Sequence, residues 1–144
     1  MKIMSVDYGD ARTGLAVCDS GETLCSPLCV IKEKNAAKLA AAIAAAAERE
    51  GARLLVVGLP KNMDGSEGAR AEKSRALAEK LKKALPEEIK IELYDERLTT
   101  MEAARYMNET GTFGKKRKNT IDAAAAAIIL EGFLQRRRAR EAKG

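Results

Sequence analysis

The order of short apolar segments along the chain is the strongest constraint on its fold. Three such segments, at 2–7, 13–18 and 24–31, follow one another closely and are separated by "YGDAR" and "DSGET". This spacing is typical of three antiparallel strands joined by tight turns. Beyond them, strand-like segments alternate with helix-forming ones. The chain therefore predicts an α/β fold in which helices pack against a mixed sheet.

The alternating part begins with an alanine-rich segment, "NAAKLAAAIAAAAEREG", which predicts a helix ending at Gly51. The uninterrupted apolar run "RLLVVGL" follows and fits a strand buried on both faces. A second helix is expected at 67–85, where Pro86 stops it, and "KIELYDE" alternates as a last strand should. These segments add two parallel strands to the antiparallel three.

The remainder of the chain predicts two more helices. In "TTMEAARYMNETG" the spacing of Thr99 and Glu102 fits a capping box. The segment "GTFGKKRKN" predicts a basic loop, and "TIDAAAAAIILEGFLQRRR" predicts a final helix with Thr120 as N-cap and Asp122 in its first turn. We expect one domain spanning 1–144, in which residues from about 136 to 144 form a basic, flexible tail.

Composition removes several classes of site. The chain has no histidine, which excludes Ser-His-Asp, Cys-His and histidine general-base chemistry. Its three cysteines, an odd number, predict reduced thiols in buried strands of a cytoplasmic protein, and a structural zinc site is nearly excluded. Five aromatic residues are too few for a base-stacking platform. No stretch is apolar enough to span a bilayer or to serve as a signal peptide.

Positive charge is concentrated near the C-terminus. The net charge is +5, and residues 111–144 hold nine basic side chains against three acidic ones. This asymmetry favours a polyanionic partner. A solvated helix end, where basic residues suit the macrodipole, explains the last residues equally well.

Three carboxylates fall where strand ends and helix starts converge in an α/β sheet. Asp7 closes the first strand, Glu96 closes the last, and Asp122 begins the final helix. Such a cluster repels itself unless cations intervene, and Mg²⁺ or Mn²⁺ prefers these oxygen ligands. A pair of such ions can activate water and stabilise the leaving oxygen of a phosphodiester. Each acid also has a plainer role as a turn or helix-start residue, and Asp95 lies on the opposite strand face from Glu96.

Four motifs carry a resemblance to a known family: "DYGDARTGLAV", "VVGLPKNMDGSEG", "DERLTTMEA" and "IDAAAAAIIL". In this order, from Lys2 to about Phe133, the chain resembles the YqgF family, Holliday-junction-resolvase-like proteins of the RNase H-like superfamily described as pre-16S rRNA nucleases. The resemblance implies an RNase H-like fold with a five-stranded mixed sheet. It also implies that Asp7, Glu96 and Asp122 form a metal-binding catalytic triad.

Further residues are candidates for binding substrate through its phosphates. Arg12 could instead pair with an acid such as Asp10, and Ser66 could instead be a helix N-cap. Arg97 could orient Glu96, and "KKRK" at 115–118 precedes Asp122 closely enough to clamp nucleic acid. The candidate substrate-binding set is Arg12, Lys61, Asn62, Ser66, Arg97, Lys115, Lys116, Arg117 and Lys118.

The sequence thus predicts a hydrolase: a metal-dependent endonuclease with two Mg²⁺ or Mn²⁺ ions. Processing of the 5′ end of pre-16S rRNA in ribosome biogenesis is the first expectation for its substrate. Resolution of four-way DNA junctions and non-catalytic binding of nucleic acid are the alternatives. The expected partners are structured RNA or branched DNA and ribosomal particles, with no membrane, and the chain could act as a monomer or a homodimer.

Overall fold

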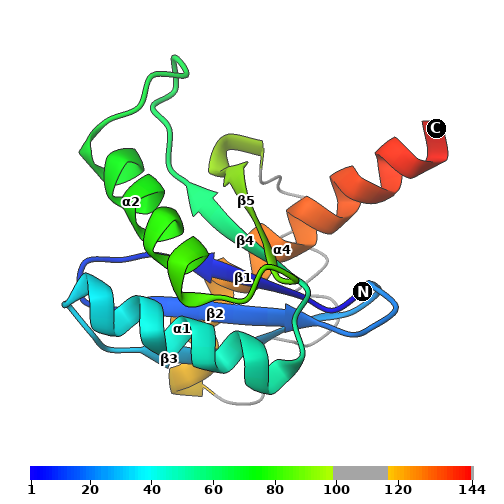
Figure 1. Cartoon of the computed structure of the whole chain (residues 1–144). Coiled ribbons are helices and arrows are strands. Elements are labelled where there is room, and N and C mark those ends of the chain that lie inside the picture. Colours follow the sequence, from blue (N-terminus) through cyan, green and yellow to red (C-terminus); the bar gives the residue numbers. More distant parts are fainter. Residues whose placement is uncertain (99–116, 144) are drawn as a thin grey trace.

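The computed structural model describes residues 1–98 and 117–143, with side chains described for 1–98 and 123–142. Its centre is a five-stranded sheet (Figure 1). The strands are β1 (Ile3–Asp7), β2 (Thr13–Cys18), β3 (Cys25–Ile31), β4 (Leu54–Leu59) and β5 (Lys90–Asp95). They lie in the order β3-β2-β1-β4-β5, antiparallel from β3 to β1 and parallel from β1 to β5. The predicted mixed sheet is confirmed.

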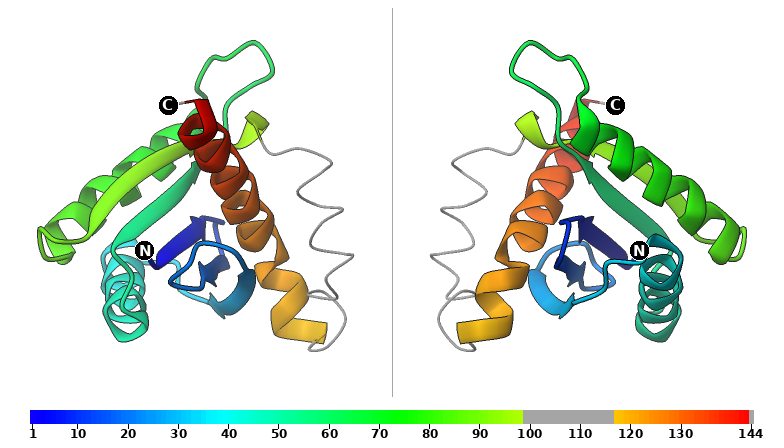
Figure 2. Two further views of the ribbon diagram at one scale, coloured as in Figure 1. Left: turned by 90° about the vertical axis from the view of Figure 1, so that its right-hand side faces the viewer. Right: turned by 90° about the vertical axis from the view of Figure 1, so that its left-hand side faces the viewer.

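Two helices cover one face of the sheet. These are α1 (Ala36–Glu50) and α2 (Ala69–Ala84), which lie on the opposite side of the strands from the last helix (Figure 2). In α1 the Asn35 side chain accepts a hydrogen bond from the Lys38 amide, and Gly51 ends the helix at φ 72°, where glycine is favoured. Both boundaries of α1 can be predicted from the sequence, because asparagine and glycine are residue types that favour these two cap positions.

The last helix, α4 (Arg117–Lys143), covers the other face, which it meets through alanine and leucine side chains. It begins three residues before the predicted N-cap at Thr120, so that prediction is wrong. Arg117 and Lys118 belong to the helix, as expected of good helix formers, and Asp122 lies in its second turn. The helix expected at 99–111 lies outside the described residues.

Alternating residues of β1 face the two helical layers, as the pattern predicts. Met4 and Val6 lie in the core beneath α1 and α2, whereas Ile3 lies in the core beneath α4. Ser5 is fully buried on the α4 side, where its hydroxyl donates a 2.6 Å hydrogen bond to the Ala126 carbonyl. This bond fixes α4 against β1 two residues before Asp7.

The C-terminal part of α4 is held by ion pairs. The helix continues through the expected tail as far as Lys143, so this segment is helical. Arg137 donates to Glu22 in the β2–β3 turn at 2.8 Å, and the same carboxylate accepts from the N-terminal ammonium group. Arg138 donates to the fully buried Glu131 at 3.0 Å. Part of the excess positive charge therefore stabilises the fold.

The cysteines lie in the strands, as the sequence predicts. All three cysteines are free thiols in strands, and burial raises the pKa of each, but only Cys18 and Cys25 are buried, whereas Cys29 of β3 is partly exposed. Within the described part of the chain, none of the helices combines the length and the apolarity needed to cross a membrane.

Candidate active site

Asp7 is a carboxylate at the centre of the sheet. It is the last residue of β1, which pairs with β2 on one side and β4 on the other. Its side chain is half-buried, and this burial raises the pKa of the carboxyl group, while Arg70 opposes the rise. Without a compensating partner a carboxylate is costly in such a place, so Asp7 requires a nearby cation.

Glu96 approaches Asp7 from a strand that is not its neighbour. It is the first residue of the 3₁₀ turn Glu96–Leu98, directly after β5, and β4 lies between β5 and β1. Burial raises the pKa of the Glu96 carboxyl group, and the negative charge of Asp7 raises it further. The structure therefore brings the two predicted carboxylates within electrostatic reach of each other.

Gly58 of β4 creates the space that Glu96 occupies. A Cβ atom at this position would lie 2.8 Å from Glu96 Oε2 and 3.1 Å from Ile129 Cδ1 of α4. A side chain at position 58 would therefore collide with the carboxylate. From the sequence, Gly58 was only one residue of the apolar run "RLLVVGL", with no role at the site. A glycine within an otherwise apolar strand was the available signal, since it indicates close approach of another group.

Asp7, Gly58 and Glu96 lie on the sheet face that α4 covers. Leu54 and Val56 share this face with Ile3, and Gly58 continues their alternation. Asp122 belongs to α4, one helical turn before Ala126, the residue bonded to Ser5. Because α4 runs toward the start of β1, this earlier turn is placed near the end of β1 that carries Asp7. The Asp122 side chain itself lies outside the described part.

Arg70 is the cation that the sequence interpretation missed. It is the second residue of α2, and its positive charge opposes the raised pKa of both Asp7 and Glu96. A cation is disfavoured in the first turn of a helix because the macrodipole is positive there. An arginine at this position, following a loop at the carboxyl end of a central strand, was the signal available in the sequence.

Asp95, the alternative to Glu96, has a different role. Its carboxylate accepts from Arg97, with Nη2 at 2.7 Å, and this pairing lowers the pKa of Asp95. Arg97 also donates to the Met63 carbonyl at 3.3 Å. The described contacts of Arg97 therefore join the end of β5 to the β4–α2 loop. Its predicted contact with substrate stays a prediction.

The β4–α2 loop, residues 60–68, is a small hairpin that projects beyond the sheet (Figure 1). Lys61 and Glu67 form an antiparallel bridge at its base, and Asn62 and Ser66 are joined by main-chain and side-chain hydrogen bonds of 2.9 Å. Ser66 also donates to Asp64, so it does not cap α2, whose N-cap is Gly68. The alternative role of Ser66 as an N-cap is therefore wrong, and the loop presents Lys61, Asn62 and Ser66 together.

The other predicted substrate contacts are less closely defined. Arg12 is an exposed residue of the β1–β2 turn, and Asp10 in the same turn accepts from Lys73 at 3.3 Å. Arg117 and Lys118 open α4, with their side chains outside the described part. Lys115 and Lys116 lie outside the described residues altogether.

The carboxylate set is incomplete without Asp122. Among the side chains that the structure describes, no three His, Cys, Asp or Glu groups gather closely enough to hold a metal ion. Asp7 and Glu96 supply two hard oxygen donors, both desolvated, and α4 brings the backbone of a third acid to the same face. This donor set suits Mg²⁺ or Mn²⁺ rather than softer metals.

Known proteins resemble the chain in sequence. A protein-family model described as "RuvX: Holliday junction resolvase" matches residues 1–136. A protein of Anaeromyxobacter sp. (strain Fw109-5) named "Putative pre-16S rRNA nuclease" is 42% identical over 96% of this chain and 100% of its own length. A protein of Halothermothrix orenii with the same name is 42% identical over 93% of this chain and 94% of its own.

Solved structures share the fold at low identity. RuvC of Thermus thermophilus in complex with a Holliday junction substrate matches with a TM-score of 0.58 at 15% identity, covering 94% of this chain and 96% of that one. The fowlpox virus Holliday junction resolvase also gives 0.58, at 12% identity, covering 94% and 99%. These matches confirm the predicted RNase H-like architecture. The family model and the close relatives, which extend over almost the whole chain, show that this protein belongs to the RuvX family.

Proposed function

We propose that this protein is a nuclease that hydrolyses phosphodiester bonds in structured nucleic acid, with precursor 16S rRNA as its substrate. The observation that carries the proposal is the convergence of Asp7 and Glu96 on the sheet face covered by α4. Burial raises the pKa of both carboxyl groups, and Asp7 raises that of Glu96. Groups with perturbed pKa values at a strand-end crevice are typical of catalytic sites.

The carboxylates fit a divalent ion. Asp7, Glu96 and Asp122 are the residues that would hold it, because hard cations prefer carboxylate oxygen and ease the repulsion between like charges. When bound, Mg²⁺ or Mn²⁺ supplies an activated nucleophile and neutralises charge on the phosphate. The site contributes these ligands and the one described cation that opposes both raised pKa values, Arg70.

The chain's own groups have separate roles. Asp7 and Glu96 must be ionised to act as ligands, and Gly58 allows Glu96 to reach its place. Arg70 offsets their combined negative charge. The 60–68 hairpin offers Lys61, Asn62 and Ser66 beside the site, while Arg12, Arg97 and residues 115–118 complete the proposed set of contacts to phosphates.

The substrate proposal follows from the close relatives, whose name specifies pre-16S rRNA. A second candidate is a four-way DNA junction, because the family description names Holliday junction resolvase. The catalytic acids do not distinguish the two substrates, since recognition of RNA rests on contacts to the 2′-hydroxyl elsewhere in the site.

The test compares cleavage of a pre-16S rRNA fragment and a four-way DNA junction, each with Mg²⁺ or Mn²⁺. We expect the wild type to cut the RNA faster than the junction. Asp7→Asn should lower the rate by about 10²–10³-fold, the scale expected when one charged group of a preorganised site is lost. The substitution keeps the side-chain size and removes only the charge.

Glu87→Gln is the matched control, because Glu87 is exposed in the turn between α2 and β5, at the opposite end of β5 from Glu96. It should cut as fast as the wild type. Equal rates for Asp7→Asn and wild type would remove Asp7 from the mechanism. Tight binding of RNA without any divalent-ion-dependent cleavage would favour the non-catalytic alternative.

A further inference from the structure

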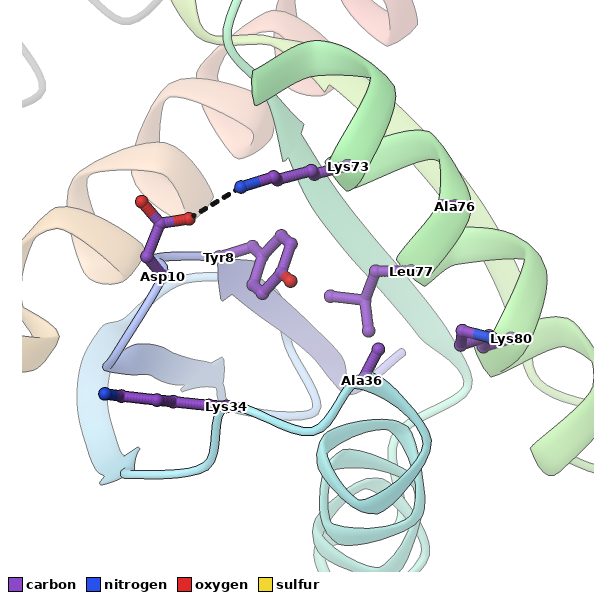
Figure 3. Close-up of a pocket in the computed structure, with 8 residues that line it drawn as sticks. All are labelled: Tyr8, Asp10, Lys34, Ala36, Lys73, Ala76, Leu77 and Lys80. Atoms are coloured by element: carbon purple, nitrogen blue, oxygen red, sulfur yellow. Dashed lines mark hydrogen bonds and ion pairs between the residues drawn. The ribbon is translucent and has the colours of Figure 1, made fainter. Parts of the chain in front are cut away.

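A cavity of about 410 Å³ opens beside the end of β1. Its walls come from three parts of the chain: the segment after β1, the β3–α1 connection and α2 (Figure 3). The residues that define its chemistry are Tyr8, Asp10, Lys34, Lys73, Leu77 and Lys80. Tyr8 directly follows Asp7 but packs against the core beneath α1 and α2, so the cavity lies around the end of β1, on the other face of the sheet from Asp7 and Glu96.

Three lysines surround this cavity with a single aspartate. Figure 3 shows Lys73 and Lys34 on opposite sides of the Tyr8 ring and Lys80 beyond Leu77. Among the side chains that the structure describes, Lys34 and Lys80 have no acidic partner within ion-pair distance. The cavity therefore has a net positive rim.

The Lys73–Asp10 pair does not remove this character. The two side chains are 58% and 82% exposed, and their ion pair spans 3.3 Å. An exposed pair of this kind is screened by water and contributes little free energy. Lys73 can therefore turn toward a phosphate at small cost.

The start of α1 adds to the positive potential. Ala36, the first residue of this helix, lines the cavity, and the first turn of α1 contains no acidic residue. The partial positive charge of the helix N-terminus therefore lies at the cavity wall, and the Glu33 carboxylate, which accepts a 3.1 Å hydrogen bond from the Asn35 amide, offsets part of it.

The interior of the cavity is apolar, in contrast to its charged rim. The Tyr8 ring, Leu77 and the methyl groups of Ala36 and Ala76 form its walls. A single ring is not a stacking platform, but it offers one aromatic face to one base. The volume falls within the range that encloses small organic ligands, whereas a double helix is too wide to enter.

We propose that this cavity holds one unpaired nucleotide of the strand that crosses the active site, with its base against Tyr8 and Leu77 and its phosphates at Lys34, Lys73 and Lys80. This inference rests on the proposed nuclease function and specifies its substrate as a duplex or folded RNA with an unpaired extension. A free mononucleotide has the same chemistry, and the experiment separates the two sources.

The experiment measures binding in EDTA by fluorescence anisotropy, so that no cleavage contributes. The probes are an RNA duplex with a single-stranded extension, the same duplex with blunt ends, and adenosine monophosphate. We expect Lys34→Gln/Lys80→Gln to weaken binding of the extended duplex about tenfold and to lower its salt slope by about 1.4. Binding of the blunt duplex should remain at the wild-type level.

Lys83→Gln/Lys90→Gln is the matched control, because it removes two exposed lysines that do not line the cavity. It should bind the extended duplex like the wild type. Tyr8→Leu should weaken the extended duplex about tenfold without changing the salt slope, since stacking involves no counterion release.

Unchanged binding of the extended duplex by Lys34→Gln/Lys80→Gln would overturn the inference. An equal loss for blunt and extended duplexes would also overturn it, because that result indicates general electrostatic attraction. Mononucleotide binding as tight as that of the extended duplex would make the cavity a small-molecule site instead. Failure of the nuclease proposal would appear separately, as the absence of divalent-ion-dependent cleavage of either substrate by the wild type.

Discussion

The carboxylates at the two ends of the central strand, β1, differ in how fully cations of the chain compensate their charge. At the carboxylate end, formed by Asp7 and Glu96, burial raises the pKa of both carboxyl groups, and the charge of Asp7 raises that of Glu96 further. At the paired end, formed by Glu22, Glu131, Arg137 and Arg138, each described carboxylate accepts from at least one cation at 2.8–3.0 Å. Both ends contain partly or fully buried acids, so burial alone does not distinguish them.

The difference separates a functional site from a structural one. Charges at the paired end are balanced within the chain, and their hydrogen bonds fix α4 to the β2–β3 turn. At the carboxylate end, the described cation that offsets the charge of both acids is Arg70, and the pKa of each acid is still raised. We propose that a divalent cation supplies the remaining compensation at the carboxylate end. Arg137 and Arg138, two of the nine basic residues in 111–144, therefore stabilise the fold at the end of the sheet away from Asp7.

The largest predicted effect is a loss of cleavage when the space beside Glu96 is filled. Gly58→Ala places a methyl group at the position 2.8 Å from Glu96 Oε2 and should displace the carboxylate from Asp7. We expect cleavage to fall about 10–100-fold, as when a residue that orients a metal ligand is changed. The measurement is the rate per folded molecule, with the folded fraction obtained from thermal denaturation.

Gly21→Ala is the control for this variant, because the nearest atoms to a Cβ at position 21 are 3.9 Å away. It should retain the wild-type rate. If Gly58→Ala cleaves as fast as Gly21→Ala, the position of the Glu96 carboxylate does not limit the reaction.

The second prediction concerns the paired end, where the two members of the Arg138–Glu131 ion pair are replaced one at a time and the losses of stability are compared. Arg138→Met leaves the fully buried Glu131 without its arginine and should cost about 2 kcal/mol, lowering Tm by about 4–8 °C. Glu131→Gln leaves Arg138, whose side chain is 47% exposed, to be solvated by water and should cost less. Urea denaturation of both variants gives the comparison. The reverse order would show that the arginine, not the buried acid, dominates this cluster.

The smallest effect concerns the stability of the carboxylate end. A raised pKa means that the folded state binds the proton more tightly than the unfolded state, so Asp7 favours folding when protonated and opposes it as pH rises. In EDTA at neutral pH, Asp7→Asn should therefore raise stability by about 0.5–2 kcal/mol. The gain should vanish in acid, below the ordinary carboxyl pKa, where wild-type Asp7 is protonated in both states.

Thermal denaturation over a pH series measures this gain, with Asp10→Asn as the exposed control. A stabilisation that persists unchanged into acid would assign the effect to packing rather than charge. Added Mg²⁺ should stabilise the wild type more than Asp7→Asn, because a ligand stabilises only the state that binds it.

The sequence by itself determined the elements and their order. Alternation in β1, the uninterrupted apolar run of β4 and the caps of α1 at Asn35 and Gly51 are local signals, read over a few residues. With the handedness and adjacency rules for strand connections, they define the five-stranded mixed sheet. Placement of Asp7 and Glu96 at strand ends also followed from these signals.

The tertiary structure decided which residues meet. Arg70 beside the carboxylates, Gly58 beneath Glu96 and the three lysines around the cavity come from segments far apart in the chain. Their meeting depends on the strand order and on how α1 and α2 pack, and no local pattern contains that information. The start of α4 at Arg117 shows the same limit, since the helix extends past the residue best suited to cap it. Local periodicity specifies elements over a few residues, whereas burial and charge at a site are properties of the assembled layers.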